Sequence, residues 1–145
     1  MNSRMKYLLV VIAALAICGR TLAQETDTTY RLSTHILDIS SGDPAPGVRV
    51  LLERSADDGD SWMEVAEKTT LESGRINDFL PIVDDTYVDD DAIYRLTFYT
   101  KAYFEDRQID SFFPFVTVVF KMKGTQHYHV PITLSPYGYT TYRGS

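Results

Sequence analysis

The stretch HYHVPITLSPYGYTTYRGS, residues 127–145, concentrates side chains that can do chemistry. His127 and His129 flank a tyrosine at its start, and Arg143 and Ser145 stand at its other end. An imidazole with an ordinary pKa of about 6.5 can accept and return a proton near neutral pH. An arginine can hold an anionic substrate through its forked donors and stabilise an oxyanion. The segment therefore contains candidate groups for acid–base catalysis.

Strand alternation divides the first part of this segment into two faces, because successive side chains of an extended chain point to opposite sides. The apolar face of residues 127–134, a candidate core face, holds Tyr128, Val130, Ile132 and Leu134. The other face holds His127, His129 and Thr133. Two imidazoles separated by one residue lie about 7 Å apart along a strand.

Three interpretations of these histidines remain open on the residues alone. They could be solvated positions on the outer face of a sheet, since imidazole tolerates a half-buried surface. They could bind zinc together with His35, the third histidine of the chain, and leave a fourth position for water. They could also act without metal as acid and base, with the substrate held by Arg75 in the turn SGRIND or by Arg143.

The elements that must position these groups read as short strands divided by turns. The runs AIYRLTFYT and FVTVVFKMK are typical strands, one by its period of two and the other by its β-branched and aromatic residues. Trp62 and Val65 are candidate core residues of a further β-prone run, and the turn that precedes Arg75 is marked by a glycine. So little helix favours an antiparallel β-sandwich. The expected strands cover residues 30–38, 48–54, 61–70, 92–100 and 115–123, and a short helix is expected within 101–108.

Residues 1–23 have the features of a secretory signal peptide, and residues 24–145 form one domain. Arg4 and Lys6 precede an apolar run that is shorter than the roughly 20 residues of a membrane span, and we expect cleavage after Ala23. A retained membrane anchor and lipidation at Cys18 are the alternatives. Ile17 disfavours lipidation, because a small residue usually precedes the modified cysteine. The sequence thus predicts an exported, periplasmic protein without stable membrane association.

Cleavage would change the formal net charge from −6 to −9 and remove the single cysteine. An acidic protein is a poor partner for nucleic acid or an anionic membrane surface. An exported domain without cysteine depends on its core or on subunit contacts for stability. The acidic runs DDGD and VDDD raise calcium binding, but neither matches an EF-hand loop, and we interpret both as solvated turns.

Five stretches, LSTHILD, GDPAPGV, SGRI, SFFPFVTVVF and above all the terminal HYHVPITLSPYGYTTYRGS, resemble 5-hydroxyisourate hydrolase, the enzymatic branch of the transthyretin-like proteins. The resemblance runs from about Leu32 to Ser145. It implies a transthyretin-like all-β sandwich of about eight strands with one short helix. It also implies a homotetramer with active sites at the interface between dimers, and no metal or organic cofactor.

The same resemblance implies a reaction and a set of site residues. The reaction is hydrolytic opening of the cyclic amide ring of 5-hydroxyisourate to 2-oxo-4-hydroxy-4-carboxy-5-ureidoimidazoline, in urate degradation. The catalytic residues that it implies are His35, Arg75, His129 and Ser145, with substrate contacts from His35, Arg75 and Tyr142 and support from His127. A small-ligand carrier built on the same sandwich and a zinc hydrolase are the alternatives.

Overall fold

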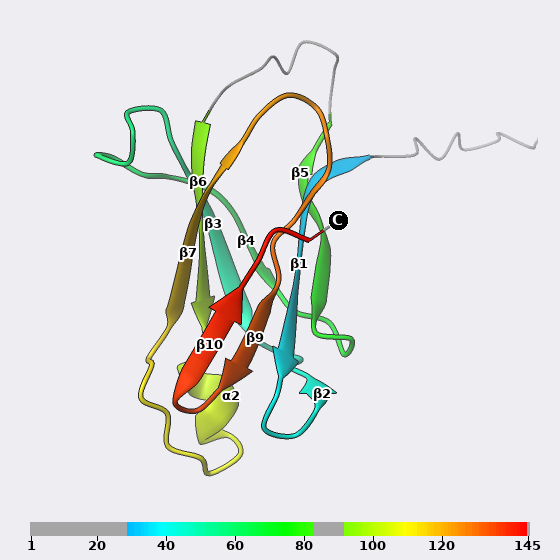
Figure 1. The fold of residues 1–145 in the computed structure, drawn as a ribbon, viewed down its shortest axis with the longest axis vertical. Helices are drawn as coiled ribbons and strands as arrows, with labels where there is room; N and C mark the ends of the chain where they lie inside the picture. The colour runs from blue at the N-terminus through cyan, green and yellow to red at the C-terminus, as the bar shows by residue number, and fades with distance from the viewer. Residues whose placement is uncertain (1–28, 83–91, 145) are drawn as a thin grey trace, which may run out of the picture.

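A computed structural model describes residues 29–82 and 92–144. Two β-sheets face each other, and a single turn of helix lies at one end of the sandwich (Figure 1). The expected fold class is confirmed. The elements are β1 (Tyr30–Asp38), β2 (Asp43–Pro44), β3 (Arg49–Ser55), β4 (Met63–Thr69), β5 (Arg75–Pro81), β6 (Ala92–Tyr99), α2 (Lys101–Glu105), β7 (Val116–Met122), β8 (Tyr128–His129), β9 (Ile132–Ser135) and β10 (Gly138–Thr141).

One sheet is organised around β1, and the other has the order β4-β3-β6-β7. The path β10-β9-β1-β2 forms the first sheet, with β5 and β8 also paired to β1. Most pairs are antiparallel, as the sequence predicts, but β8 and β9 run parallel to β1. Two parallel strands need a long connection. Here all four strands of the second sheet lie between β1 and β8 in the sequence. Residues 83–91, which include the acidic run VDDD, lie outside the described part.

The core lies between the sheets and follows the period of two. In β1, Leu32, Thr34 and Ile36 are fully buried on the inner face. The predicted core face of the C-terminal segment is confirmed, since all four of its apolar residues are buried. The prediction that Val65 belongs to the core is wrong: it is 38% exposed, because β4 is an edge strand and all of its odd-numbered residues are exposed.

Two local features place the strands that flank β1. Gly74 adopts φ +69°, and a Cβ there would stand 2.6 Å from the carbonyl oxygen of Ile36. Only glycine fits this turn, and its carbonyl accepts the N–H of Ile36 at 2.9 Å. On the other side of β1, Pro131 has no N–H to donate, so the hydrogen-bond ladder with β1 is interrupted between β8 and β9. Val130 compensates by donating its N–H to the carbonyl of Ser33 at 3.0 Å.

Within residues 29–82 and 92–144, no helix has the length and hydropathy of a membrane-spanning segment. The predicted signal peptide, residues 1–23, lies outside this range.

Candidate active site

Three of the predicted site residues meet on the outer face of the sheet that contains β1. His35 lies directly opposite Arg75 in the antiparallel β1–β5 register, and Ser33 lies opposite His129 in the parallel β1–β8 register. Residues opposite each other in a sheet present their side chains on the same face. His35 and Ser33 share that face because they are two residues apart. The sheet therefore brings together His35, Arg75 and His129 from three strands.

Arg75 is the first residue of β5 rather than part of a loop, which corrects the placement expected from its turn sequence. The Gly74 turn ends immediately before it, so the strand begins with the arginine exposed beside β1. The strand position fixes the backbone of Arg75 directly opposite His35. This placement suits a residue whose fork must meet a planar anion beside that histidine.

Ser33 was not anticipated by the sequence reasoning, although it stands two residues before His35 on the same strand face. It is 6% exposed, and its hydroxyl oxygen lies 2.9 Å from Nδ1 of His129 and 2.8 Å from Nε2 of His127. The other ring nitrogen of His127, Nδ1, lies 2.8 Å from the carbonyl oxygen of Tyr30. One buried hydroxyl thus links the two histidines of the His-Tyr-His run.

The C-terminal segment crosses this face and contacts His129. Gly144 donates its N–H to the carbonyl of His129 at 2.8 Å, and the two residues form an antiparallel bridge. A Cβ on Gly144 would stand 2.6 Å from Cδ2 of the imidazole ring. In Figure 1 the red segment that follows β10 runs toward β1. Ser145 itself is outside the described residues.

Burial and charge lower the pKa of both site histidines below the ordinary value of 6.5. For His35 the largest cause is burial, followed by repulsion from the Arg75 guanidinium, while a hydrogen bond with the Ser73 backbone opposes them. For His129 the causes are burial, then repulsion from Arg75, His35 and His127, opposed by the Ser33 backbone. Both imidazoles are therefore neutral at neutral pH, the form that can accept a proton.

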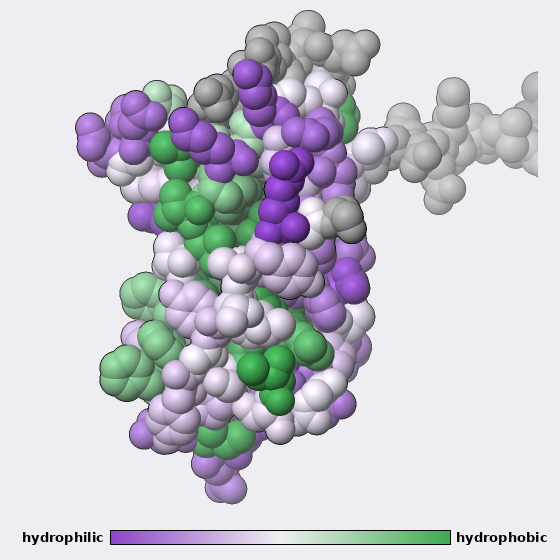
Figure 2. All heavy atoms as spheres, viewed as in Figure 1, coloured by the Kyte–Doolittle hydropathy of each residue, from purple (hydrophilic) through white to green (hydrophobic). Residues whose placement is uncertain are grey.

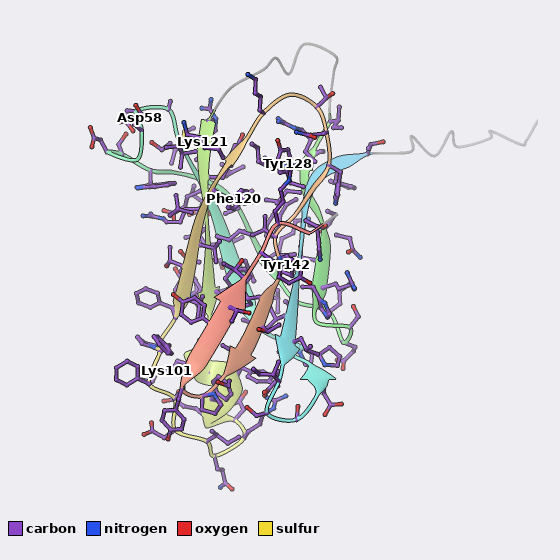
Figure 3. The ribbon with its side chains drawn as sticks, in the orientation of Figure 1. Asp58, Lys101, Phe120, Lys121, Tyr128 and Tyr142 are labelled. Carbon is purple, nitrogen blue, oxygen red and sulfur yellow. The ribbon has the colours of Figure 1, made fainter. Side chains whose placement is uncertain are left out.

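Tyr142 and Arg143 lie elsewhere, along a pocket of about 300 Å³ that no histidine lines. Tyr142 is 59% exposed, and the Arg143 guanidinium lies 5.0 Å from the ring centre of Tyr128. Figure 3 shows Tyr142 together with Phe120 and Lys121 of β7, which also line this pocket. Tyr142 thus lines a pocket whose lining contains none of the three residues on the sheet face.

The described residues bear on the zinc alternative and on the DDGD part of the calcium alternative, while VDDD lies outside them. In the described ranges, no group of three or more histidine, cysteine, aspartate and glutamate side chains is placed to hold a metal ion. In the run DDGD, the Asp57 carboxylate accepts hydrogen bonds from the Ser55 hydroxyl and from Ser61 within its own turn. These hydrogen bonds lower the pKa of Asp57 to about 2.

Fold and site together define a class of protein, a two-sheet β-sandwich with a histidine–arginine site on the outer face of one sheet. A family model described as HIUase/Transthyretin matches residues 32–144. The chain belongs to the HIUase/Transthyretin family.

Relatives from both branches of this family are similar to the chain over most of its length. The 5-hydroxyisourate hydrolase of Salmonella typhimurium is 40% identical over 97% of this chain and 98% of that protein. The solved structure of Klebsiella pneumoniae 5-hydroxyisourate hydrolase has a TM-score of 0.63 and 36% identity over 80% of this chain and 94% of its own. Transthyretin from Sparus aurata has a TM-score of 0.68 and 31% identity over 79% and 96%.

Proposed function

We propose that the chain is a 5-hydroxyisourate hydrolase of urate degradation. The observation that carries the proposal is the convergence of His35, Arg75 and His129 on one sheet face, with both imidazoles neutral. The Salmonella typhimurium and Klebsiella pneumoniae relatives that carry this name support the substrate. A carrier needs a binding surface but no acid–base pair, so the histidines favour the enzyme over a transthyretin-like carrier.

The proposed reaction is metal-free attack of water on the ring carbonyl next to the scissile C–N bond. His35 and His129 together take up the proton of the attacking water, while Arg75 orients the substrate and stabilises the negative charge that develops. The imidazolium formed in this step then protonates the leaving nitrogen. The ring opens to 2-oxo-4-hydroxy-4-carboxy-5-ureidoimidazoline. Hydrogen bonds already occupy Nδ1 of His129 and both ring nitrogens of His127, which supports a mechanism without a metal ligand set.

We also propose that the active protein is a homotetramer with its sites at the interface between dimers. The histidine–arginine group lies on an open sheet face, where one chain alone excludes little water. Two of the edge strands of the sandwich, β7 and β10, are templates for pairing with a second copy. Hydrophobic surface is visible over β7 (Figure 2), and large exposed side chains are found at both edges. They include Phe115, Val119 and Tyr139. A sedimentation experiment that finds only monomers at assay concentration would contradict this assembly.

In such an assembly Tyr142 would contact substrate and Ser145 would help to hold the histidine network. For Tyr142 we propose that a neighbouring chain completes this contact, since the pocket that Tyr142 lines contains none of the three site residues. Residues 1–23 would direct export to the periplasm, which mass spectrometry of the secreted protein tests by a new N-terminus at Gln24.

The function is tested by generating 5-hydroxyisourate from urate in the cuvette and following its ultraviolet decay with and without the purified mature protein. We expect acceleration by the wild type and a loss of about 100-fold or more on His129→Ala or Arg75→Ala, since each removes a group that acts in the transition state. Absence of acceleration by the wild type contradicts the enzyme assignment. Full activity of both variants contradicts the site. Tight binding of a small aromatic ligand without turnover would favour the carrier.

A further inference from the structure

Three hydrogen bonds connect the carbonyl of Tyr30, His127, Ser33 and His129. The donor and the acceptor of each can be assigned, because the carbonyl at the first end can only accept. The carbonyl oxygen of Tyr30 has no proton, so Nδ1 of His127, 2.8 Å away, is the donor in that contact. A neutral imidazole carries one proton. Nε2 of His127 is then a bare acceptor.

The assignment of donors and acceptors then continues from His127 through the Ser33 hydroxyl to His129. Ser33 has one hydroxyl proton, and at 2.8 Å from the bare Nε2 of His127 it donates that proton there. The hydroxyl oxygen is left to accept at 2.9 Å from Nδ1 of His129, which must therefore carry the proton of that ring.

We propose that Ser33 and His127 are positioning residues that fix the tautomer of His129, with the proton on Nδ1 and the lone pair on Nε2. The proposal rests on the proposed hydrolase function for its catalytic meaning. A histidine can act as general base only through the nitrogen that bears the lone pair. In the absence of a partner, a free imidazole side chain favours the opposite tautomer, so the protein has to impose this one.

Burial makes the chain of hydrogen bonds a strong constraint. Ser33 is 6% exposed and fixed by the β1–β8 ladder, opposite His129 itself. Water cannot easily replace a hydroxyl in such a place, and an unmade hydrogen bond there is costly. Because the carbonyl of Tyr30 belongs to the same strand as Ser33, β1 supplies both of the groups that hold the two histidines.

The first test is nitrogen-15 NMR of the full-length mature protein with labelled histidine, at a pH well above 6.5 so that the imidazoles are neutral. Long-range correlations between ring protons and nitrogens distinguish a protonated from a bare nitrogen. We expect both His127 and His129 to carry the proton on Nδ1. A proton on Nε2 of His129 overturns the proposal, whatever the activity of the protein.

The second test combines this spectrum with kinetics of Ser33→Ala. We expect the His129 signal to shift toward the Nε2–H tautomer and kcat to fall about 10- to 100-fold with little change in KM, which is typical when a partner that orients an active imidazole is lost. Ser33→Thr keeps the hydroxyl and should restore both the tautomer and part of the rate. Unchanged tautomer and unchanged kcat in Ser33→Ala overturn the proposal.

A matched control is Ser135→Ala, which removes a hydroxyl that donates to the carbonyl of Gly138 at 3.0 Å, away from the histidines. It should leave both the spectrum and the rate unchanged. The two proposals can fail separately. A wild type that does not accelerate ring opening contradicts the hydrolase proposal, but its His129 tautomer can still be measured by NMR. If Ser33→Ala does not fold, His127→Phe breaks the same chain at its exposed end, and the same His129 shift is expected.

Discussion

Gly144→Ala should disable the site while leaving the sandwich intact. The added Cβ would stand 2.6 Å from Cδ2, 3.0 Å from Cβ and 3.1 Å from Cγ of His129. Ordinary contacts begin at 3.4 Å, so the ring and the chain must separate by about 0.8 Å at the closest atom. A misplacement of about 1 Å at a reacting group can cost on the order of 100-fold in rate. We therefore expect kcat/KM to fall about 10- to 100-fold.

The stability of Gly144→Ala should change by no more than about 0.5 kcal/mol, because Gly144 lies outside the core and is held by a single bridge. Ultraviolet decay of 5-hydroxyisourate measures the rate, and thermal unfolding measures the fold. Gly138→Ala is the matched control, since its Cβ would meet only the Ser135 hydroxyl at an ordinary 3.6 Å. A Gly144→Ala enzyme with wild-type kcat/KM would refute the reasoning.

Two further predictions concern pH and a buried polar contact. Because burial and then Arg75 lower the pKa of His35 and His129, the acid limb of the kcat/KM profile should lie below 6.5, and a limb at or above that value would contradict the assignment. As pH drops below 6.5, these histidines bind protons in the unfolded chain at a higher pH than in the folded protein, so the free energy of unfolding should fall. Tyr103→Phe removes the hydroxyl that donates to the buried Asp38 carboxylate at 3.1 Å, and should cost about 1–3 kcal/mol in denaturant unfolding; an unchanged midpoint would show that this contact contributes nothing.

Local pattern was enough to predict the strands and their buried faces. The bounds of β1 match the predicted range 30–38, and the alternation around His129 separates core from site as expected. Hydrophobic periodicity acts over a few residues, and the hydrophobic effect enforces it wherever one face is buried. The helix was shorter than the expected range, ending at Glu105, because a single turn has little stability of its own.

Pairing between distant strands could not be predicted from the same information. Ser33 and His129 are 96 residues apart, and nothing in either local pattern indicates that β1 and β8 run parallel. The role of Ser33 therefore escaped prediction, although its position two residues before His35 was a usable signal. Arg75 was expected on a loop because the glycine before it looks like the centre of a turn, whereas Gly74 in fact ends the turn.

The core of the sandwich holds the site in register. A slip of β1 by one residue would turn Leu32 and Ile36 to the outer face of the sheet and turn Ser33 and His35 to the inner face between the sheets. Exposing the two aliphatic side chains would cost about 1.5–3 kcal/mol each, and burying the polar pair without partners would add to that. The packing of the inner face of β1 therefore fixes the register in which the site residues of its outer face are paired. Since both neighbours that carry site residues, β5 and β8, pair directly with this strand, the geometry between His35, Arg75 and His129 is determined by β1 more than by any loop.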